Sequence, residues 1–162
     1  MKLIGVDPGA KTVGVCTYDL ADPNGSYIER GEDEPLHAFL NRSVASVVGW
    51  VNSYDEQVLV GVEDMNPPKS HINGKKQFVK PAFLIDTGKS IGALWTGIAT
   101  QTDALLCMVP PGKHGKQPLW SYPPGLVGKR ETTGTGKAPM QHVRAAYDIA
   151  AASAFAHAAA TK

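Results

Sequence analysis

Residues 1–20 read MKLIGVDPGAKTVGVCTYDL, and this stretch decides the fold. The apolar run KLIGV ends at Asp7, Pro8 and Gly9 follow at once, and a second apolar run begins at Val13. Two β-branched runs with a glycine- and proline-containing connection between them predict a pair of neighbouring strands. Asp-Pro-Gly is by itself a common turn sequence, so Asp7 is either a turn residue or a reactive group.

Length and composition indicate one globular domain over residues 1–162. Hydrophobic residues make up 43% of the chain and charged residues 19%, which suits one core of substantial size. No window approaches the ~18 apolar residues that span a membrane, and the N-terminus does not resemble a signal peptide. Cys16 and Cys107 lie in apolar stretches, so we expect buried free thiols and a cytoplasmic protein.

The pattern of apolar residues predicts strands that alternate with helices. The predicted strands are residues 2–7, 13–19, 26–30, 57–63 and 104–109, and the predicted helices are 35–54, 82–101 and the alanine-rich segment that follows Pro139. Long loops are predicted at 66–80 and 110–138. A strand meander followed by strand–helix alternation predicts a mixed α/β domain.

Acidic residues end two of the predicted strands. Asp7 ends the first and Glu63 the fourth, so both carboxylates would emerge at one sheet edge if the strands are neighbours. Asp148, in the last predicted helix, can join them if that helix packs across the sheet. Three converging carboxylates repel one another unless a cation neutralises them, and their oxygens suit Mg²⁺ or Mn²⁺. Two such ions, ~3.5–4 Å apart, can stabilise the attacking and leaving oxygens of a phosphoryl displacement.

Basic residues concentrate in the two long loops, although the net charge is only +1. They are either solvated charges or contacts for a phosphate backbone: Lys69, Lys75, Lys76 and Lys80 in the first loop, and Lys113, Lys116, Lys129, Arg130 and Lys137 in the second. Phe78 either packs or stacks on an unpaired base. Trp120 and Tyr122 are predicted to anchor the second loop. A phosphate-binding loop ending at Lys137 is excluded, because Glu131 stands where glycine is required and Ala138 where serine or threonine is.

Four segments together resemble the RuvC-type Holliday-junction resolvases of the RNase H-like superfamily. They are IGVDPGAKTVGV (4–15), VGVEDM (60–65), GKRETTGTGKA (128–138) and AYDIAAA (146–152). The resemblance implies an RNase H-like α/β fold, with a central mixed five-stranded sheet whose first three strands are antiparallel and with flanking helices. The small size and the wording HVRAAYDIA (142–150) look most like the resolvases of bacteriophages.

The resemblance also implies a function and roles for the acidic residues. It implies a homodimeric endonuclease that cleaves four-way DNA junctions, with flap or fork DNA as further substrates, and that uses two Mg²⁺ or Mn²⁺ ions. Asp7 would bridge the ions, and Glu63 and Asp148 would complete the site. The basic residues of both loops and Phe78 would contact DNA. The glycine-rich helix 82–101 would either form the dimer face or pack on the sheet.

Ala145 departs from the family pattern, which has a second acid or histidine three residues before the final aspartate. In one alignment Asp148 is that aspartate, Ala145 marks a missing partner, and His142 reaches in from the helix start. In the other, His142 fills the first position and Ala145 stands in place of the last aspartate. We favour the first, because the residues after Asp148 fit the family better. His142 and Asp148 are then about 240° apart on an ideal helix, so His142 would need a distorted first turn.

Two other functions remain open at this point. Actin-like ATPases and sugar kinases share a related fold, but they normally contain a second, similar half for which this chain lacks room. A non-catalytic protein that binds branched DNA would account for Ala145.

Overall fold

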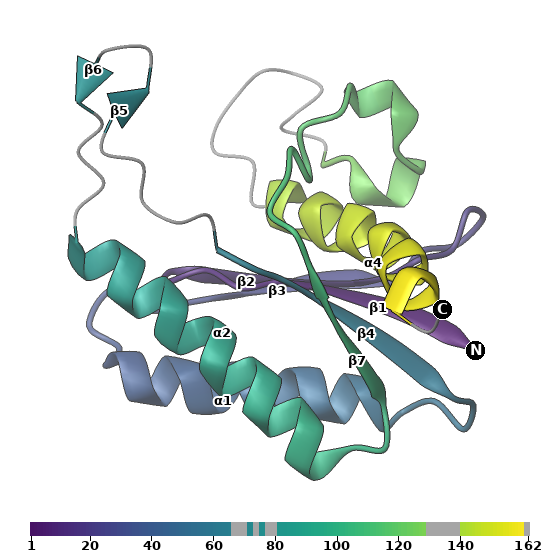
Figure 1. The fold of residues 1–162 in the computed structure, drawn as a ribbon, viewed down its shortest axis with the longest axis horizontal. Coiled ribbons are helices and arrows are strands. Elements are labelled where there is room, and N and C mark those ends of the chain that lie inside the picture. Colours follow the sequence, from purple (N-terminus) through teal and green to yellow (C-terminus); the bar gives the residue numbers. More distant parts are fainter. Residues whose placement is uncertain (66–70, 73–74, 77–80, 129–139, 161–162) are drawn as a thin grey trace.

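A mixed five-stranded sheet lies at the centre of the protein, which a computed structural model describes over residues 1–65, 71–72, 75–76, 81–128 and 140–160 (Figure 1). The strand order is β3-β2-β1-β4-β7. The strands are β1 (Lys2–Asp7), β2 (Thr12–Thr17), β3 (Gly25–Glu29), β4 (Val58–Glu63) and β7 (Leu105–Val109), and the helices are α1 (Leu36–Val51), α2 (Pro81–Gln101) and α4 (Met140–Ala160).

The sheet combines antiparallel and parallel pairing, and β1 is the strand where the two kinds meet. β1 pairs antiparallel with β2, and β2 with β3, whereas β1, β4 and β7 run parallel to one another. The predicted fold class, a mixed sheet with three antiparallel strands first, is therefore confirmed. In the β1–β4 pair Val6 lies opposite Val62, so Asp7 and Glu63 end the two strands side by side.

The helices cover opposite faces of the sheet: α1 and α2 on one face, and α4 on the other (Figure 1). Because side chains alternate along a strand, Ile4 and Val6 point into the core beneath α1 and α2. The residues between and after them, Gly5 and Asp7, therefore face α4. In β4 the same alternation sends Val58, Val60 and Val62 to the α1–α2 core, and Gly61 and Glu63 to the α4 face.

α4 lies unusually close to the sheet because the strands present glycine to it. A Cβ atom on Gly5 would overlap the backbone of Ala146 and Ala150, one on Gly14 would meet the carbonyl of His142, and one on Gly61 would meet Ser153 and Ile149. We call Gly5, Gly14 and Gly61 the glycine strip. It fixes the height of α4 above the strand ends through backbone contacts, which side-chain rotation cannot relax.

The predicted loops contain more structure than expected. Within 66–80 the chain forms a two-stranded hairpin, β5 (His71–Ile72) with β6 (Lys75–Lys76). Asn73-Gly74 separates the two strands in the sequence and is the strongest short hairpin signal, which the loop prediction overlooked. Within 110–138 there are two 3₁₀ turns, η1 (Leu119–Ser121) and η2 (Pro124–Leu126).

The small residues of α2 do not pack on the sheet as a group, so that prediction is wrong. Gly97 packs against Val44 of α1, because a Cβ there would meet the Val44 side chain. Gly92 faces open space instead, in a shallow groove between α1 and α2 that Val44, Ala93 and Thr96 help to line.

Both cysteines are free thiols, as predicted. Cys16 is fully buried beneath α4, and burial raises the pKa of its thiol to about 12. Cys107 is only partly buried, in contrast to the prediction. Over the part of the chain that the structure describes, none of the helices combines the length and apolar character that crossing a membrane requires.

Candidate active site

Asp7 and Glu63 lie at the carboxyl ends of adjoining parallel strands, on the face that α4 covers. Neighbouring strands are about 4.8 Å apart, so the register of β1 with β4 brings the two residues close together. Both side chains are largely shielded from solvent, at 16% exposure for Asp7 and 18% for Glu63. The predicted convergence of these two acids at one sheet edge is what the topology produces.

His142 contacts Asp7 from the first turn of α4. Its Nδ1–H donates to Oδ2 of Asp7 across 2.7 Å. That hydrogen bond, followed by the negative charge of Asp7, raises the pKa of His142, while burial acts in the opposite direction. α4 is helical from Met140 onward, so His142 reaches the strand end without the distorted turn expected from the sequence.

Glu63 has a second histidine as its partner. Nδ1 of His114, in the segment after β7, lies 2.7 Å from Oε1 of Glu63, and the Gly112 backbone N–H donates to the same oxygen across 3.1 Å. His114 was absent from the residues predicted from sequence. No motif marks it, because its position depends on the path of an irregular segment.

Asp148 points away from His142, in line with the spacing along the helix, and binds the loop. Its Oδ2 accepts the Tyr122 hydroxyl at 2.7 Å and the Gly115 backbone N–H at 2.8 Å. Tyr122 is buried, and burial, followed by its bond to Asp148, raises its pKa to about 12. Tyr122 thus anchors the loop as predicted, whereas Trp120 does not, since it is 86% exposed.

Ala145 is buried beneath the same loop. Gly115, at φ 71°, packs so closely on α4 that an added Cβ would lie 2.6 Å from the carbonyl oxygen of Gln141 and 3.1 Å from the Cβ of Ala145. Backbone therefore occupies the space next to the position where the family pattern has an acid or a final aspartate.

The donor types fit a divalent cation, although the side chains form two separate pairs. Among the described residues, Oδ1 of Asp7 and Oε2 of Glu63 accept no hydrogen bond, which leaves one oxygen of each carboxylate for a cation. Within the same part of the chain, no three acidic, histidine or cysteine side chains lie close enough to share one ion. The two-ion site with Asp7, Glu63 and Asp148 therefore stays a prediction.

Only two of the predicted DNA contacts have described side chains. Lys113 and Lys116 are exposed and flank His114 in the segment after β7. The side chains of the other eight lie outside the described residues: Lys69, Lys75, Lys76, Phe78, Lys80, Lys129, Arg130 and Lys137.

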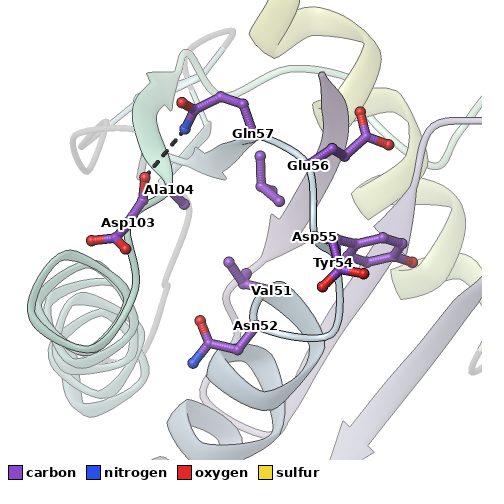
Figure 2. A pocket seen from close by; sticks show the side chains of 9 residues that line it. Val51, Asn52, Tyr54, Asp55, Glu56, Gln57, Asp103 and Ala104 are labelled. Atoms are coloured by element: carbon purple, nitrogen blue, oxygen red, sulfur yellow. Dashed lines mark hydrogen bonds between the residues drawn. The ribbon is translucent and has the colours of Figure 1, made fainter.

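A pocket among the described residues lies elsewhere. Figure 2 shows it between the end of α1 and the starts of β4 and β7, where Gln57 Nε2 donates to the carbonyl of Asp103 across 3.2 Å. The candidate site lies at the opposite ends of β1 and β4, so this pocket is no part of it.

Comparison with solved structures identifies the fold. The chain matches Thermus thermophilus RuvC in complex with a Holliday junction substrate with a TM-score of 0.65 and 17% identity, over 99% of this chain and 97% of that one. A second T. thermophilus RuvC structure matches with a TM-score of 0.62 and 20% identity, over 99% and 98%. The chain has a RuvC-like fold. The RuvC-like assignment rests on structure, since no family model and no curated protein matches the sequence.

Proposed function

We propose that the protein is a metal-dependent DNA endonuclease that resolves four-way junctions. One observation carries the proposal: Asp7 and Glu63 emerge side by side at the ends of the two central parallel strands, beneath α4, with His142 in contact with Asp7. The RuvC-like fold adds support, because T. thermophilus RuvC was solved with a Holliday junction substrate.

Asp7 and Glu63 would hold Mg²⁺ or Mn²⁺, two ions by the family resemblance. When bound, the cation would neutralise the carboxylates and stabilise charge on the phosphate oxygens. Asp7 orients the His142 ring through Nδ1, so Nε2 is the atom that would take a proton from the attacking water. His142 is 42% exposed, and a substrate can therefore reach it.

DNA would lie across the surface that includes Lys113 and Lys116. These two cations flank His114, so phosphates bound to them would be held near Glu63. By resemblance we extend the contact to the remaining predicted basic residues and Phe78, and we include flap and fork DNA as further substrates. The stretch HVRAAYDIA (142–150) favours the bacteriophage type of resolvase. Such a protein would act in the cytoplasm of bacteria or of infected cells.

Symmetric resolution of a junction requires two active sites, so we propose a homodimer. The groove between α1 and α2, with the open face of Gly92, is the surface we assign to the partner. Small residues there allow close approach of a second backbone. Sedimentation equilibrium of the wild type and of Gly92→Trp tests this assignment, because the larger side chain should shift a dimer to monomer.

The deciding experiment incubates the protein with labelled four-way, flap, fork and duplex DNA, with and without Mg²⁺ or Mn²⁺. We expect metal-dependent cleavage of the four-way junction, and none by Asp7→Asn, which should still bind the junction. Cleavage by Asp7→Asn at the wild-type rate would contradict the assignment.

A non-catalytic junction-binding protein is the second candidate. Ala145 favours it, because no carboxylate stands at the buried position beside Gly115. This candidate predicts tight binding without cleavage under any divalent ion, so the same experiment separates the two.

A further inference from the structure

The segment 112–122 contacts two carboxylates that belong to different elements. At one end the Gly112 N–H and His114 bind Oε1 of Glu63, on β4. Further along, the Gly115 N–H and the Tyr122 hydroxyl bind Oδ2 of Asp148, on α4. The segment therefore spans from the strand end to the helix.

Asp148 holds this segment at two points. One oxygen accepts both hydrogen bonds, and the Tyr122 hydroxyl also accepts the backbone N–H of Gln117 across 3.3 Å. Hydrogen bonds to a charged acceptor are stronger than those between neutral groups. Tyr122 is buried, so bulk water competes little for the bond between its hydroxyl and Asp148.

Ala145 is part of the α4 surface on which segment 112–122 packs. The close contact of Gly115 with the α4 backbone requires a small side chain at position 145 and glycine at position 115. A larger residue at either position would lift the segment, and with it the imidazole of His114.

We propose that Asp148 is a positioning residue rather than an ion ligand: with Tyr122 it holds segment 112–122 on α4, so that Gly112 and His114 orient Glu63 toward a divalent cation beside Asp7. This rests on the proposed function, because Glu63 needs orientation only if it holds an ion. Groups that orient ligands change metal affinity by about 10–100-fold when they are removed.

Mn²⁺ binding by the full-length protein tests the proposal, measured by calorimetry and by the electron paramagnetic resonance signal of free Mn²⁺. Asp7→Asn should abolish binding. Asp148→Asn, Tyr122→Phe and His114→Gln should each weaken it about tenfold. His37→Gln, at an exposed histidine of α1 on the face of the sheet opposite α4, is the matched control and should bind as the wild type does.

The double variant Asp148→Asn/Tyr122→Phe distinguishes positioning from ligation. If both residues act through the segment, the double variant should bind Mn²⁺ about as tightly as either single variant does. Both substitutions would then release the same segment, so their effects would not add. A ligand role predicts that Asp148→Asn abolishes binding, as Asp7→Asn does, while Tyr122→Phe binds as the wild type. That result would overturn the proposal.

Hydrogen exchange separates failure of this proposal from failure of the proposed function. Asp148→Asn and Tyr122→Phe should increase exchange of the Gly112, Gly115 and Gln117 amides about tenfold, with or without metal or DNA. Unchanged exchange overturns the positioning role. Absence of Mn²⁺ binding by the wild type contradicts both the proposed function and the orientation of Glu63 for an ion, even if exchange shows that the segment is held.

Discussion

The two halves of the candidate site are built in different ways. The Asp7 half consists of regular structure: a strand end, the register of β1 with β4, and a helix seated on the glycine strip. The His114 half consists of an irregular segment that is held by hydrogen bonds to Glu63 and Asp148.

The two halves differ in how much of the structure must unfold before the geometry of the candidate site is lost. Moving the His142 backbone relative to Asp7 requires α4 to leave its seat on the glycine strip. Releasing His114 requires the loss of only a few exposed or partly buried hydrogen bonds, and such local openings cost less free energy than global unfolding. The following predictions test that contrast, from the largest effect to the smallest.

Asp7→Asn should lower the rate of junction cleavage by more than about 10³-fold, or roughly 4 kcal/mol in activation free energy, because a neutral amide replaces the anionic ligand. Single-turnover cleavage of a labelled four-way junction measures the loss. Circular dichroism should show an unchanged fold. A rate within tenfold of the wild type would remove Asp7 from the centre of the site.

Gly5→Ala should lower the free energy of unfolding by about 3 kcal/mol, because its Cβ would overlap the backbone of Ala146 and Ala150. Denaturant unfolding gives the value. The matched control is Gly49→Ala, on an open face of α1, which should raise stability by about 0.5–1 kcal/mol. Equal effects at the two positions would mean that the glycine strip does not set the seat of α4.

Gly115→Ala should act locally, in contrast to Gly5→Ala. The positive φ and the close approach to Gln141 and Ala145 should lower the free energy of opening segment 112–122 by about 1–2 kcal/mol, with little change in global unfolding. Amide exchange of the segment, followed beside chemical unfolding, tests this. Gly125→Ala, where an added Cβ meets open space, serves as the control. A large loss of global stability would show that the segment belongs to the core.

Lys113→Gln and Lys116→Gln should have the smallest effect. Each should weaken junction binding a few-fold and reduce the slope of log affinity against log salt by about 1, since each phosphate contact releases a counterion. Titrations at several salt concentrations measure the slope. Lys2→Gln, at the opposite edge of the sheet, should leave it unchanged. Unchanged slopes in both loop variants would place the DNA elsewhere.

The same contrast separates what the sequence could predict from what it could not. The positions of Asp7 and Glu63 at strand ends follow from short runs of apolar, β-branched residues, whereas their adjacency depended on the condition that the two strands are neighbours. His142 was assessed against Asp148 along one helix, whereas its partner is Asp7, and only the seat of α4 on the sheet brings those two together.

His114 could not have been found by the same reasoning. Its contact with Glu63 depends on the path of a segment without periodicity, fixed by Gly115 and Tyr122 through contacts with α4. The pairing of β5 with β6 was missed for a simpler reason. The turn signal Asn73-Gly74 was present in the sequence, but the loop prediction did not use it.

The two faces of the sheet contribute differently to the structure, and this difference matters for protein engineering. Spacing at the reactive end depends on main-chain contacts between α4 and the glycine strip, whereas the larger cluster of buried valine, isoleucine and leucine lies beneath α1 and α2. We expect that this apolar layer can be redesigned extensively, for heat resistance as an example, without retuning the distance between Asp7 and His142.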